Sequence, residues 1–154
     1  MRYLRVVRHF KQTLCLTIYI STILMVIPEN TEVFEFPAST MWFDENGILC
    51  SIAKKVPQQT VEEAKKTMEE FRKITGGKKI CLLSDSTDSP PANKEMRDYA
   101  AEVMPEIAKA VAIISRSAVG KMAANLFFGI KKQPYPVKMF TDETEAKEWL
   151  KQYL

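Results

Sequence analysis

A mixed α/β sheet covered by helices, with an N-terminal antiparallel hairpin followed by alternating helix–strand units, is the fold that this sequence predicts. Two strand-like runs on either side of Asn46 and Gly47 indicate the hairpin. Short apolar runs that alternate with amphipathic patterns indicate the helix–strand units. The 154 residues, 46% hydrophobic and 27% charged, suit one globular domain with its own core.

The first strands are expected within residues 32–43, which are rich in aromatic and β-branched types. Pro37 interrupts this run and predicts an edge strand, a bulge or two short strands, because proline cannot donate a hydrogen bond to the sheet. Asn46 and Gly47 both tolerate a positive φ, so we expect a tight turn into a strand over residues 48–53.

The clearest helix spans residues 60–75. Thr60 and Glu63 have the spacing of a capping box, in which each side chain accepts from the other residue's backbone N–H. Gly76 stands where a left-handed residue ends a helix. One apolar face follows from residues that recur every three to four positions, namely Val61, Ala64, Met68, Phe71 and Ile74.

The remaining chain continues the alternation. It predicts, in order, a buried strand over 79–84, a helix over 93–104 that Pro105 ends or bends, a buried strand over 110–114, a helix over 117–128, a strand over 137–140 and a final helix capped by Thr141. Right-handed crossovers between such units make the later strands parallel.

Residues 1–24 differ from the body, so the domain is expected over residues 25–154. Residues 1–12 are basic, and an apolar run over 14–27 follows. The run is shorter than the about 20 residues that span a bilayer, and no small-residue cleavage site follows it. Three interpretations stay open: translation that starts at Met25, a short membrane anchor, or a natural extension that packs on the domain. Only the anchor would bring the protein to a membrane.

The charge balance argues against a nucleic-acid partner. The chain has 22 basic and 19 acidic residues, for a net charge of +3. Four of the basic residues, Arg2, Arg5, Arg8 and Lys11, lie in the first 24 positions, which contain no acid. The body is therefore nearly neutral and lacks the basic excess of nucleic-acid binders.

Histidine and cysteine usage argues against most enzyme classes. The only histidine is His9, so the body cannot carry out serine–histidine or cysteine–histidine catalysis. The three cysteines are too far apart for a disulfide framework or a zinc site, and Cys50 and Cys81 lie in apolar runs as small hydrophobes. We expect a cytoplasmic protein with no catalytic residues, no metal and no cofactor.

Two candidate polar sites follow from strand ends, because ligands of open α/β sheets bind beyond the carboxyl ends of the strands. The first comprises Asp85, Ser86 and Thr87. The second is a candidate anion site comprising Ser115, Arg116 and Ser117. The same residue types are also ordinary helix caps and turn formers.

A third candidate is an apolar groove for a small molecule or a partner surface. Small residues beside large ones in the 117–128 segment could leave room for an apolar ligand. The residues in question are Met122, Leu126, Phe127 and Tyr135. Packing of a helix on the sheet calls for nearly the same residues.

Three segments resemble small bacterial SpoIIAA-like proteins of the STAS (anti-sigma-factor-antagonist) superfamily, which overlap in fold with Sec14-like lipid binders. They are residues 110–114, 123–128 and 140–150, and the likeness extends over about residues 32–154. The resemblance implies a mixed sheet and a regulatory role. In partner-switching members, a kinase phosphorylates a serine or threonine after a central strand, and here that position is Ser86 or Thr87.

The sequence therefore predicts a non-enzymatic regulatory or protein-interaction module, with phosphorylation-controlled partner switching as one form of it. The alternative is a Sec14-like binder of an apolar small molecule or lipid.

Overall fold

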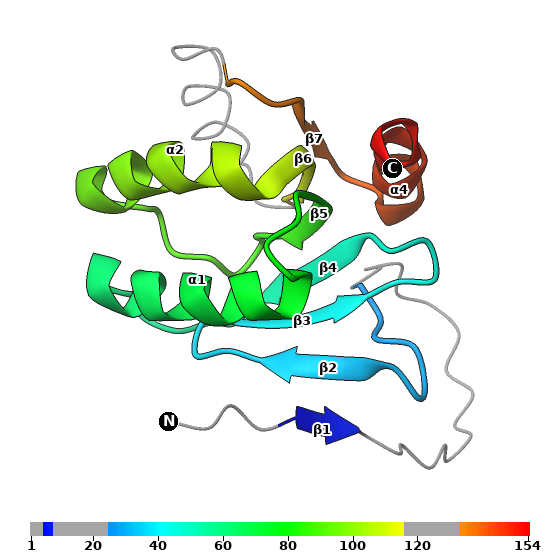
Figure 1. Cartoon of the computed structure of the whole chain (residues 1–154), viewed down its shortest axis with the longest axis horizontal. Helices are drawn as coiled ribbons and strands as arrows, with labels where there is room; N and C mark the ends of the chain where they lie inside the picture. The colour runs from blue at the N-terminus through cyan, green and yellow to red at the C-terminus, as the bar shows by residue number, and fades with distance from the viewer. Residues whose placement is uncertain (1–4, 8–24, 116–132) are drawn as a thin grey trace.

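The computed structural model describes residues 5–7, 25–115 and 133–154 and shows a seven-stranded mixed sheet (Figure 1). The strands are β1 (Arg5–Val7), β2 (Glu32–Glu35), β3 (Ser39–Phe43), β4 (Leu49–Ala53), β5 (Ile80–Asp85), β6 (Ala108–Ile114) and β7 (Val137–Phe140). The helices are α1 (Val61–Thr75), α2 (Lys94–Ile107) and α4 (Glu143–Leu150), which continues into the 3-10 turn η1 (Lys151–Tyr153). The predicted fold class is confirmed.

The order of the strands in the sheet is the order of the chain. Strands β1 to β4 pair antiparallel, and β4 to β7 pair parallel. The predicted helix over residues 117–128 lies outside the described residues.

The run over residues 32–43 forms two short strands, β2 and β3, with Pro37 in the turn between them. The Phe36 N–H donates to the Ser39 carbonyl oxygen at 2.8 Å and closes this turn. Because Pro37 lies between the two strands, the N–H that proline lacks does not remove a hydrogen bond between strands of the sheet.

The second hairpin joins β3 to β4 as predicted, but its turn differs from the expected one. Gly47 has a φ of 79°, whereas Asn46 keeps a negative φ. The Gly47 N–H donates to the Asp44 carbonyl oxygen at 3.0 Å, and the Asp44 N–H donates to the Ile48 carbonyl oxygen at 2.9 Å. The loop is therefore a longer turn with one left-handed glycine, not a two-residue turn with two left-handed residues.

Part of the N-terminal segment adds an edge strand to the sheet. Strand β1 runs antiparallel to β2, with Val6 opposite Val33. Met25 is buried at 4% exposure, and the half-buried Ile27 packs against the same core cluster. No helix of the described part of the chain is long and apolar enough to cross a membrane. Residues 8–24 lie outside it, so the interpretation of this segment stays a prediction.

Helix α1 has the predicted ends. The Glu63 N–H donates to Thr60 Oγ1 at 3.2 Å, and the Thr60 N–H donates to Glu63 Oε2 at 2.8 Å, which completes the capping box. Gly76 ends the helix with a φ of 60°. Phe71 is the buried centre of the apolar face.

Two predicted helix boundaries are wrong. Helix α2 continues through Pro105 to Ile107, and β6 begins at the next residue. The proline lies in the last turn, where it removes one hydrogen bond, and the packing of the buried Val103 and Ile107 on the sheet outweighs that loss. At α4 the N-cap is Asp142 rather than Thr141, since Asp142 Oδ1 accepts from the Glu145 N–H at 2.9 Å.

The sheet has an apolar core on each face. On one face α1 and α2 cover a cluster of buried residues that comprises Leu49, Phe71, Val103 and Ile107. On the other face α4 covers a larger cluster that includes Trp42, Cys50, Leu83 and Leu150. Alternate residues of β3, β4 and β5 contribute to the two clusters, as the pleat of a strand requires.

Candidate functional site

Asp85, Ser86, Thr87 and Ser115 are the described members of the two predicted polar sites. They lie where the parallel strands β5, β6 and β7 have their carboxyl ends. Asp85 pairs with Ile114, and Ile114 pairs with Phe140. The Ser115 N–H then donates to the Phe140 carbonyl oxygen at 3.4 Å. Asp85 therefore ends β5, and Ser115 directly follows the end of the neighbouring strand β6.

The turn that follows β5 is bound to the end of β6 through Ser86. Its N–H and its hydroxyl both donate to the Ile114 carbonyl oxygen, at 2.9 Å and 3.2 Å. The Ser89 N–H donates to the Ser86 carbonyl oxygen at 3.1 Å and closes the turn. Ser86 thus holds the ends of two parallel strands together.

Two carboxylates flank the hydroxyls of this turn. Asp85 is only 3% exposed, and its Oδ1 accepts from the Thr87 N–H at 3.0 Å. Asp88 is exposed, while Ser86 and Thr87 are half-buried. The turn therefore presents two hydroxyl groups between a buried and an exposed acid, with α2 beginning only at Lys94.

Ser115 is the one member of the predicted anion site that the structure describes. It is 1% exposed, and its Oγ has no hydrogen-bond partner among the described residues. Arg116 and Ser117 lie outside those residues. The strand order contains no reversal, so the sheet lacks the crevice that such a reversal creates in doubly wound folds.

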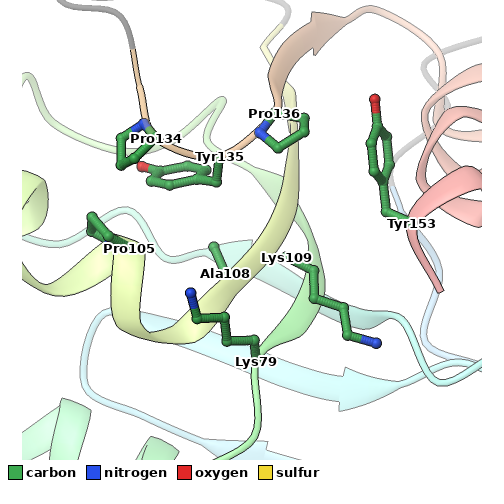
Figure 2. A pocket seen from close by; sticks show the side chains of 8 residues that line it. All are labelled: Lys79, Pro105, Ala108, Lys109, Pro134, Tyr135, Pro136 and Tyr153. Carbon is green, nitrogen blue, oxygen red and sulfur yellow. The ribbon is translucent and has the colours of Figure 1, made fainter.

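The predicted apolar groove is only partly described, because Met122, Leu126 and Phe127 lie outside the described residues. Tyr135 lies just before β7, at the opposite end of the parallel strands from Ser86. It lines a pocket of about 350 Å³ together with Lys79, Pro105, Ala108, Lys109, Pro134, Pro136 and Tyr153 (Figure 2). Burial raises the pKa of the Tyr135 phenol.

Sequence reasoning missed this pocket and its two lysines. Lys79 directly precedes β5, and Lys109 is the second residue of β6. Parallel strands have their amino ends on the same side of the sheet. Lysines near the starts of two consecutive strands could therefore have indicated a positively charged site there.

The described residues show no metal-binding group and no activated thiol. Within residues 5–7, 25–115 and 133–154, no group of three or more histidine, cysteine or acidic side chains could hold a metal ion. Cys50 is fully buried, and burial raises its pKa from 9.0 to about 12, so its thiol stays protonated at neutral pH. Lys147 and Asp44 shift this pKa in opposite directions, but burial dominates.

Comparison with known proteins agrees with the fold. The profile of a family described as "Domain of unknown function (DUF7793)" matches residues 41–154. A solved structure from Shewanella loihica PV-4, an uncharacterized protein of the DUF3478 family with a SpoIIAA-like fold, is 20% identical with a TM-score of 0.55. The match covers 73% of this chain and 92% of that one. The resemblance of this fold to SpoIIAA-like proteins is thereby confirmed.

A second solved structure, of a protein with unknown function from Arthrobacter sp. FB24, is 26% identical with a TM-score of 0.26. The match covers 71% of this chain and 90% of that one. No curated protein matches the sequence significantly.

Proposed function

This chain belongs to the DUF7793 family, and from that premise we propose that it is a non-enzymatic regulatory module that binds a protein partner and is switched at the turn after β5. The SpoIIAA-like fold supports the regulatory class. One observation carries the proposal: Ser86 holds the end of β5 to the end of β6 through the Ile114 carbonyl oxygen. A modification of that hydroxyl acts on two strands at once.

A phosphate on Ser86 would weaken this attachment, because only the backbone N–H would still donate to the Ile114 carbonyl oxygen. The modified oxygen has no proton to donate, so its hydrogen bond to the Ile114 carbonyl oxygen, worth about 1 kcal/mol, is lost. The phosphate also adds nearly two negative charges beside Asp85 and Asp88, and like charges repel. We expect the turn to move away from β6. A partner that binds at the carboxyl ends of β5 and β6 would then no longer find its binding surface.

Thr87 is the second candidate phosphoacceptor. Its backbone N–H bonds to Asp85 Oδ1 at 3.0 Å, so a phosphate on Thr87 would lie close to that buried carboxylate. Both modifications act in the same direction, because each adds negative charge to a turn that already contains two acids.

We place this activity in the bacterial cytoplasm. Cys50 and Cys81 are free, buried thiols, which supports a reducing compartment.

The experiment combines intact-mass spectrometry with partner recovery. Protein purified from its native cells is weighed and digested, and we expect one phosphate that maps to Ser86 or Thr87. Tagged wild type, Ser86→Ala and Ser86→Glu are then used to recover partners, which are quantified by mass spectrometry. Ser86→Ala also loses the hydroxyl hydrogen bond but adds no charge, so a partner that binds wild type and Ser86→Ala but not Ser86→Glu supports a switch driven by the added charge.

Ser89→Glu is the matched control. Ser89 is exposed in the same turn, and its substitution adds the same charge without touching the Ile114 carbonyl oxygen. It should keep the partner. Equal loss with Ser89→Glu, or a phosphate-free protein whose bound partners are the same for every variant, contradicts the proposal.

A further inference from the structure

The pocket at the amino ends of β5, β6 and β7 is far from the turn discussed above. Lys79 precedes β5, Ala108 begins β6, and Pro136 precedes β7. The six residues of β5 place roughly 17 Å between this end of the sheet and Ser86. With a volume of about 350 Å³ the pocket is at the lower end of the range for small-molecule sites.

The pairing of β5 with β6 is irregular at Lys109, which lines this pocket. Ile80 pairs with Ala108, but the next residue, Cys81, pairs with Ala110, so the pairing of the two strands passes over Lys109. Bulges of this kind redirect a side chain and are enriched beside functional sites. The irregularity is therefore a second observation, independent of the pocket itself, that points to this place.

The charges of the pocket are all positive and unpaired among the described residues. Lys79 and Lys109 line it, and no described lining residue is acidic. Neither lysine has an ion-pair partner in the described part of the chain, in contrast to Lys54, Lys147 and Lys151, which all do. An anion bound here would not have to displace a carboxylate.

The other walls consist of proline, alanine and tyrosine side chains. Lys79, Ala108 and Lys109 lie across the pocket from the chain segment that contains Tyr135 and its two flanking prolines (Figure 2). Tyr153 lies at one side and packs edge-on against Trp149, with ring centroids 5.1 Å apart. Proline and tyrosine rings offer flat apolar contact at little cost in conformational entropy.

We propose that this pocket binds a small organic monoanion that contains a flat ring, such as an aromatic carboxylate. The two ammonium groups point to different sides of the pocket (Figure 2), so one binds the carboxylate and the other adds positive charge nearby, while the proline and tyrosine rings hold the apolar part. The pocket also lies at the carboxyl ends of α2 and α4, whose dipoles are negative there. That field opposes any bound anion, and it opposes a dianion such as a phosphate more strongly than a monoanion, so the two lysines suit a single negative charge better than two. The proposal does not depend on the switch at Ser86.

The test uses 2-naphthoate as the probe and neutral 2-naphthamide as its matched isostere, titrated into the full chain and followed by ¹H–¹⁵N NMR. We expect saturable shifts of the amides of Lys79, Lys109 and Tyr135, with weaker binding at higher salt. Naphthamide should bind at least tenfold more weakly. Lys109→Gln should weaken naphthoate binding about fivefold to tenfold, because one charge-assisted bond is lost.

Lys138→Gln is the control variant. It removes the same charge from an exposed lysine of neighbouring β7 that lies over the Phe140 ring and not in the pocket. Its affinity for naphthoate should equal that of wild type, and thermal unfolding checks that all variants are folded. Equal effects of Lys138→Gln and Lys109→Gln, equal binding of the two probes, shifts centred on residues 85–88, or no saturable binding would each overturn the proposal.

Discussion

Replacement of Asp44 by alanine should destabilise the domain by about 3 kcal/mol, because this side chain organises the turn between β3 and β4. Asp44 Oδ1 accepts from the N–H groups of Asn46 and Ile48, both at 2.9 Å. Ile48 is fully buried, so its N–H finds no other partner when the Asp44 carboxylate is removed. Loss of this hydrogen bond costs about 2 kcal/mol. Asn46 is exposed and can bond to water, so we assign it about 0.5 kcal/mol.

Lys147 contributes the remainder. Its Nζ lies 3.9 Å from Asp44 Oδ2, with the carboxylate side chain 6% exposed and the lysine 28% exposed. A partly solvated pair at that distance is worth about 0.5 kcal/mol. Asp44→Asn keeps the acceptor oxygen and loses only charge, so we expect it to cost about 1 kcal/mol.

Urea unfolding followed by circular dichroism measures these differences. For a slope of about 2 kcal/mol/M, Asp44→Ala should lower the midpoint by about 1.5 M. Glu45→Ala is the control, because Glu45 is exposed in the same turn and should stay within about 0.5 kcal/mol of wild type. A loss below about 1 kcal/mol for Asp44→Ala, or equal losses for the alanine and asparagine variants, would show that the two backbone hydrogen bonds do not hold the turn.

Three further changes test the core and the helix cap. Leu150→Ala removes a fully buried side chain that packs α4 on the sheet, and it should lower the unfolding free energy by about 2–5 kcal/mol in the same urea assay. The pKa of the Cys50 thiol is 9.0 in the unfolded chain and about 12 in the folded protein. The contribution of the protonated thiol to the unfolding free energy is therefore complete below pH 9 and decreases as the pH rises above 9. At pH 10 the loss is about 1.4 kcal/mol, and it should be absent from the pH profile of Cys50→Ala. Hydrogen bonds from Thr60 lower the pKa of Glu63 below 4.5, so its stabilising effect is present above that pH and is lost as the pH falls. Thermal unfolding of Glu63→Gln should therefore vary less below pH 4.5 than that of wild type.

Features set by neighbouring residues were predictable from the sequence. The capping box of α1 needs only Thr60 and Glu63 at the right spacing, and Gly76 ends the helix by its own conformational freedom. At α2, packing on the sheet outweighed the local stop signal of Pro105. The error at α4 arose where two adjacent residues compete. Thr141 and Asp142 are both good N-caps, and the choice between them depends on where β7 ends.

The long-range part of the fold was less predictable. The sequence predicted Asp85 and Ser115 at the carboxyl ends of strands, and in the structure these strands, β5 and β6, are neighbours. The pairing of Cys81 with Ala110 skips Lys109, and no local pattern encodes such a skip. The skip was therefore not predictable, but the lysines near the starts of β5 and β6 were a usable signal for the pocket that was not followed. The sequence therefore predicted the site with hydroxyl groups at the carboxyl ends of the parallel strands. It did not lead us to the site with lysine side chains at their amino ends.

The sequential order of the seven strands affects how the chain can fold during synthesis. Each new strand pairs with the one made just before it, so the sheet can grow by addition at one edge while the ribosome is still translating. Neighbouring contacts close short loops, which favours rapid folding. Helix α4 is the exception, because it packs on β5 and β6 and comes from the last residues of the chain. The face of the nascent sheet that α4 covers therefore lacks this helix until the residues that follow β7 have been made.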